Sequence, residues 1–366
     1  MALQCGIVGL PNVGKSTLFN ALTSAKAESA NYPFCTIDPN VGVVTVPDER
    51  LEKISELIKP KSQIPTAMEF VDIAGLVAGA SKGEGLGNQF LANIRETDAI
   101  LHVVRCFEDS NVIHVAGNVD PLRDIDVINT ELMLADFETI EKRIKKIEKV
   151  AQTTKDSKIK AEYNLVKKVY DALEAGQPAR TVVPGESEEK IYRELHLLTS
   201  KPVLYVCNVS EEEFANGGSE FVKQVEERAK QETNQCLMVC SSLESEIAQL
   251  DAEEKVEFLE SIGAKEPGLH RLIRDSYQLL ELITFFTAGE KEVRAWTAKR
   301  GSKAPQAAGV IHTDFEKGFI RAETYHCEDL FTLKSEGAVK EAGKYRSEGK
   351  EYLVKDGDVM LFRFNV

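Results

Sequence analysis

The stretch GLPNVGKST occupies residues 9–17 and follows the short apolar run Leu3–Gly9. It fits the pattern G-x-x-x-x-G-K-[ST], with an apolar run that predicts a strand before it and a predicted helix over Ser16–Ala25 after it. A glycine-rich loop in this position presents backbone N–H groups and a helix N-terminus, and both bind phosphate. The stretch therefore predicts a nucleotide-binding loop (P-loop) in an α/β fold.

The side chains of this loop have distinct expected tasks. The Lys15 ammonium is expected to neutralise β- and γ-phosphate oxygens, and the Ser16 hydroxyl is expected to ligate Mg²⁺. The segment predicted to contact the nucleotide runs through Asn12, Val13, Gly14, Lys15, Ser16 and Thr17.

A second motif, DIAG, begins at Asp72 after the predicted strand Ala67–Val71. A carboxylate at the end of a strand next to the P-loop is expected to hold Mg²⁺ through water. The Gly75 N–H is expected to meet the γ-phosphate. A run rich in glycine follows (Gly79, Gly83, Gly85, Gly87) and is expected to change conformation with the phosphate state of the nucleotide. An ordinary flexible loop is the alternative, because it would have the same composition.

Further β-branched and apolar runs alternate with helical patterns along the chain. Strands interleaved with helices predict a mostly parallel sheet covered on both faces. The runs are Val41–Val46, Ala67–Asp72, Ile100–Cys106, Val203–Asn208 and Cys236–Ser241.

Two other sequence patterns interrupt or follow this alternation of strands and helices. Apolar residues spaced by 3 and 4 over 133–151 and 159–173, with charged residues between them, predict a helical hairpin that packs as a coiled coil. A surface helix pair packed on the main domain is the alternative. After residue 280, short strand-like runs predict a strand-rich module. These runs are Leu282–Thr287, Val293–Ala298, Gly309–Ile311, Tyr352–Lys355 and Met360–Asn365.

The predicted organisation is therefore an NTPase domain (1–130 plus 200–280), a helical insertion (131–199) and a C-terminal module (281–366). The net charge is −14, which argues against a protein coated with nucleic-acid-binding positive charge, and no sequence-specific DNA binding is expected. Residues 131–200 and 281–366 are balanced in charge, whereas the rest holds 18 basic and 32 acidic residues. These balanced segments are the surfaces least repelled by an RNA-rich partner.

Cellular location also follows from composition. Seven cysteines are scattered without a C-x-x-C pair, which indicates reduced thiols and no zinc site. No apolar stretch approaches the roughly 18 residues of a membrane helix, and no secretory signal is expected. The sequence predicts a cytoplasmic protein without a membrane partner, and we expect a monomer.

The chain resembles the YchF subfamily of Obg-like ATPases, within the Obg group of translation-factor-type NTPases. The resemblance rests on residues 9–17, 31–40, 72–90 and 95–106 and extends over the whole length. It implies that Thr36 is a second Mg²⁺ ligand and that the ribosome is the partner. It also implies that the last module is a TGS domain with a ubiquitin-like β-grasp fold, because 309–315 and 318–320 carry that likeness.

The base preference is predicted from the segment after the strand Pro202–Cys207. A guanine-specific site carries N-K-x-D, whereas this chain has Asn208-Val209-Ser210-Glu211. Glu211 moves the carboxylate by a methylene, and Val209 lacks the lysine stem that covers a base. The change argues against guanine without proving adenine. The similar N-x-x-E of the YchF subfamily implies ATP, with GTP weaker; Ser241 and Ser242 are expected at the base edge.

Hydrolysis is expected to be slow and assisted. The position after DIAG, where many relatives place a water-orienting Gln, is Leu76. Asn12 resembles the Asn that related NTPases use to hold K⁺. His114 follows the fourth predicted strand, and the imidazole of a histidine is suited to orienting or deprotonating water. With Lys15 these form the predicted catalytic set, although His114 could equally be a structural histidine. Arg95 and Arg105 are expected to be structural.

The sequence is compatible with three functions. The first is a ribosome-associated regulatory ATPase that acts in translation or stress regulation, with Mg²⁺ and a further K⁺ as cofactors. The second is a nucleotide-gated binding adaptor with incidental turnover. The third keeps the fold but prefers GTP or accepts both nucleotides.

Overall fold

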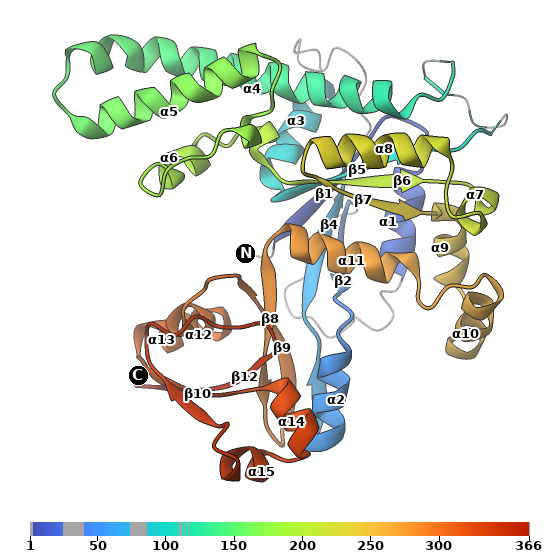
Figure 1. Ribbon diagram of the computed structural model, residues 1–366, viewed down its shortest axis with the longest axis vertical. Coiled ribbons are helices and arrows are strands. Elements are labelled where there is room, and N and C mark those ends of the chain that lie inside the picture. Colours follow the sequence, from blue (N-terminus) through green and yellow to red (C-terminus); the bar gives the residue numbers. More distant parts are fainter. Residues whose placement is uncertain are drawn as a thin grey trace. The chain divides into compact units, whose positions relative to one another are not determined.

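The computed structural model describes residues 3–24, 40–73, 86–109, 112, 114, 115 and 117–365. The chain divides into two compact units, and Figure 1 shows the elements of both. The first unit comprises Met1–Val43 and Glu69–Leu269, and the second comprises Val44–Met68 and His270–Val366. Each unit is described by itself below.

The first unit is built on a six-stranded sheet in the order β2-β4-β1-β5-β6-β7. The β1–β4, β1–β5, β5–β6 and β6–β7 pairings are all parallel, which confirms the predicted α/β sheet. The strands are β1 (Gln4–Val8), β2 (Val41–Thr45), β4 (Ala67–Asp72), β5 (Ala99–Arg105), β6 (Val203–Asn208) and β7 (Gln235–Val239).

The central strands are apolar runs because helices cover the sheet on both faces. Every residue of β5 and β6 is buried. In a parallel sheet of this kind, ligands bind beyond the carboxyl ends of the strands. The helices are α1 (Lys15–Ser24), α3 (Leu86–Glu96), α4 (Pro121–Thr153), α5 (Ser157–Glu174), α6 (Glu189–Glu194), α7 (Glu211–Ala215), α8 (Glu220–Gln231), α9 (Ser241–Ile247), α10 (Ala252–Ser261) and α11 (Gly268–Leu279), whose last ten residues belong to the second unit.

The helical insertion is a hairpin of α4 and α5, which lie side by side in Figure 1. Helix α4 has 33 residues, so it is about 50 Å long. Its second half packs on α5 through a buried apolar cluster (Ile140, Val166, Val169, Leu173, Ala179, Leu197). Asp136 fixes the returning chain by accepting hydrogen bonds from the Leu198 and Thr199 N–H groups, at 2.8 and 2.7 Å. The apolar residues that recur at spacings of 3 and 4 therefore lie on the facing sides of the two helices.

The second unit contains a mixed six-stranded sheet in the order β11-β10-β12-β8-β9-β3. The β12–β8 and β3–β9 pairings are parallel, whereas β8–β9, β10–β12 and β10–β11 are antiparallel. Its elements are α2 (Glu49–Ile58), β3 (Ser62–Ile64), β8 (Leu282–Ala288), β9 (Glu292–Lys299), α12 (Ala304–Ile311), α13 (Thr313–Lys317), β10 (Phe319–His326), α14 (Cys327–Leu333), α15 (Glu336–Glu341), β11 (Arg346–Glu348) and β12 (Asp358–Phe364).

Two sequence predictions for this module are wrong. Gly309–Ile311 is not a strand but the end of α12, whose Ala304, Ala307 and Ala308 are buried on one helical face. Tyr352–Lys355 forms only an isolated bridge between Leu353 and Lys303. Short apolar runs do not distinguish a buried helix turn from a strand, so tertiary packing decided both cases.

The second unit also recruits a segment that the sequence analysis did not associate with it. Helix α2 and strand β3 come from residues 44–68, and β3 extends the sheet beside β9. Arg50 of this segment forms an ion pair with Asp356 at 2.6 Å. The predicted three-domain boundaries and the β-grasp (TGS) assignment of the last module stay predictions.

Candidate functional site

The P-loop lies between β1 and α1, as its motif requires. Lys15 is the first residue of α1, and its Nζ donates a hydrogen bond to the Leu10 carbonyl at 2.7 Å. Burial lowers the pKa of Lys15 to about 8, although the nearby Asp72 carboxylate acts in the opposite direction. The ammonium is therefore held inside the loop without a full counter-charge, which suits it to receive an anionic phosphate.

Backbone geometry explains the two special positions of the loop. Asn12 and Gly14 have φ values of 62° and 95°, in the left-handed region. Asn is among the few residues that tolerate this conformation. A Cβ on Gly14 would lie 2.2 Å from the Asn208 Nδ2, so only glycine fits there. The loop is thus closed around a neighbouring side chain and not merely flexible.

Ser16 and Asp72 come together beside Lys15. The Ser16 hydroxyl donates to the Asp72 Oδ2 at 3.2 Å, across 56 residues of sequence. A hydroxyl and a carboxylate are hard oxygen donors of the kind that Mg²⁺ prefers, so this pair fits a magnesium ion. Thr36 and Gly75, the other residues predicted for this end of the site, lie outside the described residues, as does Leu76.

Asn208 connects the P-loop to the end of the sheet. Its side chain is buried; Nδ2 donates to the Val13 carbonyl at 2.9 Å, and Oδ1 accepts from the Ser241 N–H at 3.0 Å. Three segments that are distant in sequence are therefore fastened by one amide. Ser241 Oγ is buried, and within the described part of the chain it has no hydrogen-bond partner. Ser241 also lines the cavity described next.

A cavity of about 810 Å³ opens beside this amide. Its volume lies in the range of small-molecule and cofactor sites. Glu211 lies at its wall, where its Oε1 accepts a hydrogen bond from the Ser242 hydroxyl at 3.4 Å. The cavity is lined by Asn12, Gly14, Thr17, Phe107, Glu108, Asp109, Val112, Asn208, Val209, Ser210, Glu211, Glu212, Ser241 and Ser242.

One wall of the cavity was missed by the sequence analysis. Phe107, Glu108, Asp109 and Val112 follow β5 and face the segment after β6 across the cavity. They are held by Arg105, which is 1% exposed and donates to the carbonyls of Phe107, Val112 and Asp109 at 3.1, 3.0 and 3.3 Å. The Arg105 guanidinium also lies 4.6 Å from the centre of the Phe107 ring. In the sequence, the aromatic Phe107 close after the end of this strand was the signal that could have indicated this wall.

His114 lies close to the same loop but is not among the residues that line the cavity. It is 7% exposed, and its Nε2 is 2.8 Å from the Asp124 Oδ2 in the first turn of α4. Asp124 also contacts Arg123 at 3.3 Å. The structure therefore gives His114 a defined partner, and its catalytic role stays a prediction.

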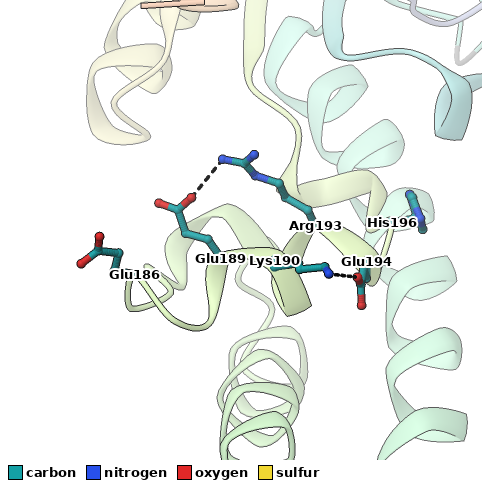
Figure 2. A pocket seen from close by; sticks show the side chains of 6 residues that line it. All are labelled: Glu186, Glu189, Lys190, Arg193, Glu194 and His196. Carbon is teal, nitrogen blue, oxygen red and sulfur yellow. Dashed lines mark hydrogen bonds and ion pairs between the residues drawn. The ribbon is translucent and has the colours of Figure 1, made fainter. Parts of the chain in front are cut away.

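A second hollow, of about 380 Å³, lies along α6 and has none of these features. Figure 2 shows two ion pairs along the helix among the side chains that line it. Arg193 pairs with Glu189 at 3.0 Å, and Lys190 pairs with Glu194 at 4.0 Å. Such exposed ion pairs contribute little to the stability of the fold. We assign no function to this hollow.

Two family models match different parts of the chain. The family model described as "50S ribosome-binding GTPase" matches residues 4–134. The YchF-GTPase_C model, described as a protein of unknown function, matches residues 282–365. "Ribosome-binding ATPase YchF" from Bacillus subtilis (strain 168) is 60% identical over 100% of both chains. The chain belongs to the YchF family.

Other relatives agree with this assignment. "Ribosome-binding ATPase YchF" from Escherichia coli O157:H7 is 57% identical over the full length of both chains. The solved structure of the Schizosaccharomyces pombe YchF GTPase superposes with a TM-score of 0.90 at 42% identity, over 99% of this chain and 98% of that one. The YchF fold, with its P-loop domain, helical insertion and mixed C-terminal sheet, is therefore shared over the whole chain.

The described part of the chain contains no helix long and apolar enough to cross a membrane. It also contains no group of three or more His, Cys, Asp or Glu residues that could hold a metal ion by themselves. A Ser–Asp pair that shares its ion with a nucleotide's phosphates needs no such cluster.

Proposed function

We propose that this YchF-family protein is a cytoplasmic, ribosome-associated ATPase that binds ATP in preference to GTP and hydrolyses it slowly. The names of the B. subtilis and E. coli relatives support the ATPase activity and the ribosome as partner. The observation that carries the base preference is the cavity wall formed by Asn208, Val209 and Glu211.

This wall lacks the two features that select guanine. Val209 is 3% exposed, and it replaces the lysine whose stem would cover a base. Glu211 accepts a hydrogen bond from Ser242 through Oε1, and its longer side chain moves the carboxylate by a methylene from where the Asp of N-K-x-D would hold it. A site discriminates strongly when its polar groups would be left unpaired by the wrong ligand, and guanine's two donors find no dedicated carboxylate here.

The residues of this chain account for binding and orientation. The Lys15 ammonium and the N–H groups at the start of α1 bind phosphate oxygens. Ser16 and Asp72, with Thr36, would hold Mg²⁺, which neutralises charge on the phosphates when it is bound. Ser241, which lines the cavity, is expected to lie beside the base edge. Phe107 supplies an aromatic face to the cavity.

Water activation is assigned to His114, with a K⁺ ion near Asn12 as an additional source of positive charge. His114 is oriented by Asp124, and such a carboxylate favours one imidazole tautomer. His114→Ala is expected to lower turnover at saturating ATP and to leave ATP affinity unchanged. Unchanged turnover would remove His114 from the mechanism.

Equilibrium competition between ATP and GTP for the full-length protein tests the base preference. We expect ATP to displace a fluorescent nucleotide at lower concentration than GTP. Equal displacement, or the reverse order, would favour the GTP-using alternative. Val209→Lys/Glu211→Asp, which restores the guanine pattern, is expected to shift the preference toward GTP.

A binding adaptor with incidental turnover is the second candidate, favoured by Leu76 at the position of the usual catalytic Gln. Single-turnover hydrolysis with and without ribosomes, in K⁺ and in Na⁺, separates the two. We expect ribosomes or K⁺ to accelerate hydrolysis. An adaptor would show the same slow rate under all four conditions.

A further inference from the structure

The end of the α4–α5 hairpin has a charge opposite to that of the rest of the chain. Residues 142–160, here called the hairpin tip, carry eight basic and two acidic side chains, a net charge of +6. Because the whole chain carries −14, the remaining residues carry −20. The basic side chains are Lys142, Arg143, Lys145, Lys146, Lys149, Lys155, Lys158 and Lys160.

All eight of these side chains are exposed. Three of them pair with carboxylates near the base of the tip: Lys142 with Glu138, Lys145 with Glu141, and Arg143 with Glu162. Within the part of the chain that the structure describes, the other five form no ion pair. Most of the positive charge at the outermost turn is therefore available to a partner.

The backbone that carries these lysines is ordered by its own caps. The Thr154 N–H donates to the Val150 carbonyl at 2.9 Å and ends α4. The Asp156 side chain accepts from the Lys158 N–H at 2.8 Å and begins α5. Ala151, near the end of α4, is buried. One of the two acidic residues of the tip is thus occupied in capping a helix, and the lysines are held on a fixed turn.

The chemistry of the tip favours a polyanion over a membrane. Residues 142–160 contain no aromatic residue, and Val150 is the large apolar side chain exposed there, at 48%. Interfacial membrane segments need a broad apolar face as well as basic residues. Without aromatic side chains the tip offers no platform on which bases could stack. What remains is a set of point charges suited to phosphates.

We propose that the hairpin tip binds the sugar–phosphate backbone of ribosomal RNA, without regard to base sequence. This inference rests on the proposed ribosome association and names the surface that makes the contact. A local charge of +6 also orients the approach to RNA, because the residues outside the tip carry a net charge of −20. The length of α4 places this contact at the far end of the hairpin from the sheet (Figure 1).

The test compares two triple variants of the full-length protein. Lys149→Gln/Lys155→Gln/Lys158→Gln neutralises three unpaired tip lysines. Lys53→Gln/Lys223→Gln/Lys230→Gln removes the same charge from exposed lysines on α2 and α8. Binding is measured by co-sedimentation with ribosomes and by fluorescence anisotropy with purified ribosomal RNA, from 50 to 200 mM KCl. ATP turnover without ribosomes should be unchanged in both.

We expect the tip variant to bind RNA and ribosomes at least about tenfold more weakly. The slope of the logarithm of the binding constant against the logarithm of the salt concentration should become less steep by roughly 2, because three phosphate contacts are lost. The control variant should bind as the unaltered protein does. Ribosome binding that is equal in both variants would overturn the tip contact and leave ribosome association standing.

Two further outcomes separate the causes. If the unaltered protein does not sediment with ribosomes, the proposed function fails; the RNA arm then still decides the tip, since tip-dependent RNA binding supports it and tip-independent binding overturns it. Phosphatidylglycerol vesicles serve as the competing polyanionic surface. Tip-dependent binding to vesicles that exceeds binding to RNA would overturn the proposal.

Discussion

The Asn208 Nδ2 donates a hydrogen bond to the Val13 carbonyl at 2.9 Å, although 195 residues separate them along the chain. The same amide accepts from the Ser241 N–H through its Oδ1. One side chain therefore fixes the P-loop against the two segments that follow β6 and β7. The cavity residues of the P-loop and those around Ser241 are therefore joined through this amide.

Asn208→Ala should weaken the attachment of the P-loop and of the segment at Ser241 at the same time. The Val13 carbonyl and the Ser241 N–H would each lose a buried partner, so the free energy of unfolding is expected to fall by about 1–3 kcal/mol. ATP affinity should fall together with stability. Urea unfolding and nucleotide titration measure the two effects. Asn216→Ala, at an exposed position after α7, is the matched control and should leave both unchanged.

Gly14→Ala should prevent the P-loop from closing. The new Cβ would meet the Asn208 Nδ2 at 2.2 Å and would occupy a left-handed backbone with φ of 95°. Nucleotide binding is expected to be lost. Gly176→Ala is the control, because its φ is 72° but nothing lies within 4 Å. The control should cost only about 1 kcal/mol of backbone strain and retain binding; equal effects would show that conformation alone, and not the Asn208 contact, matters.

The pKa of Lys15 predicts a pH dependence of ATP binding. Without nucleotide the pKa is lowered to about 8, and bound phosphate favours the charged form. ATP affinity is therefore expected to be constant below pH 7 and to fall as the pH rises above 8. Calorimetry at pH 8.5 in buffers of different ionisation enthalpy should detect proton uptake on binding. Lys15→Met should bind weakly and without this pH dependence.

Stability of the nucleotide-free protein should respond in the opposite direction. The Lys15 pKa is lower in the folded chain than its ordinary value of 10.5, so the unfolded chain holds more protons between pH 8 and 10.5. The contribution of Lys15 to the free energy of unfolding then rises with pH in that window. Comparing unfolding of the unaltered protein with that of Lys15→Met isolates this contribution, and a difference that does not vary with pH would contradict it.

Arg105→Met should damage the cavity wall while keeping most of the side-chain volume. The carbonyls of Phe107, Asp109 and Val112 would lose their donor. ATP affinity is expected to fall by about tenfold, which corresponds to about 1.4 kcal/mol. Arg95→Met, at an exposed position on α3, is the control and should bind ATP normally. Normal ATP binding by Arg105→Met would show that the Arg105 hydrogen bonds are not required to hold the cavity wall in place.

Much of the first unit could be predicted because its signals are local. The motif at 9–17 and its flanking apolar runs fix a strand, a loop and a helix in order. The 3–4 spacing in 133–151 likewise predicted the inner face of α4, which Ile140 now occupies as a buried residue. The second unit was harder, since Gly309–Ile311 has the composition of a short strand and only packing of the preceding alanines makes it helical.

The P-loop, the alternation of strands and helices, the helical hairpin and the altered motif at Asn208–Glu211 were all determined by the sequence itself, because each depends on residues that are neighbours in the chain. Tertiary structure alone decided that Asn208 fastens Val13 to Ser241, that Arg105 braces the opposite wall, and that residues 44–68 join the C-terminal sheet. Hydrogen bonds and strand pairs between distant segments leave no periodic trace in sequence, since their partners are chosen only when the chain packs.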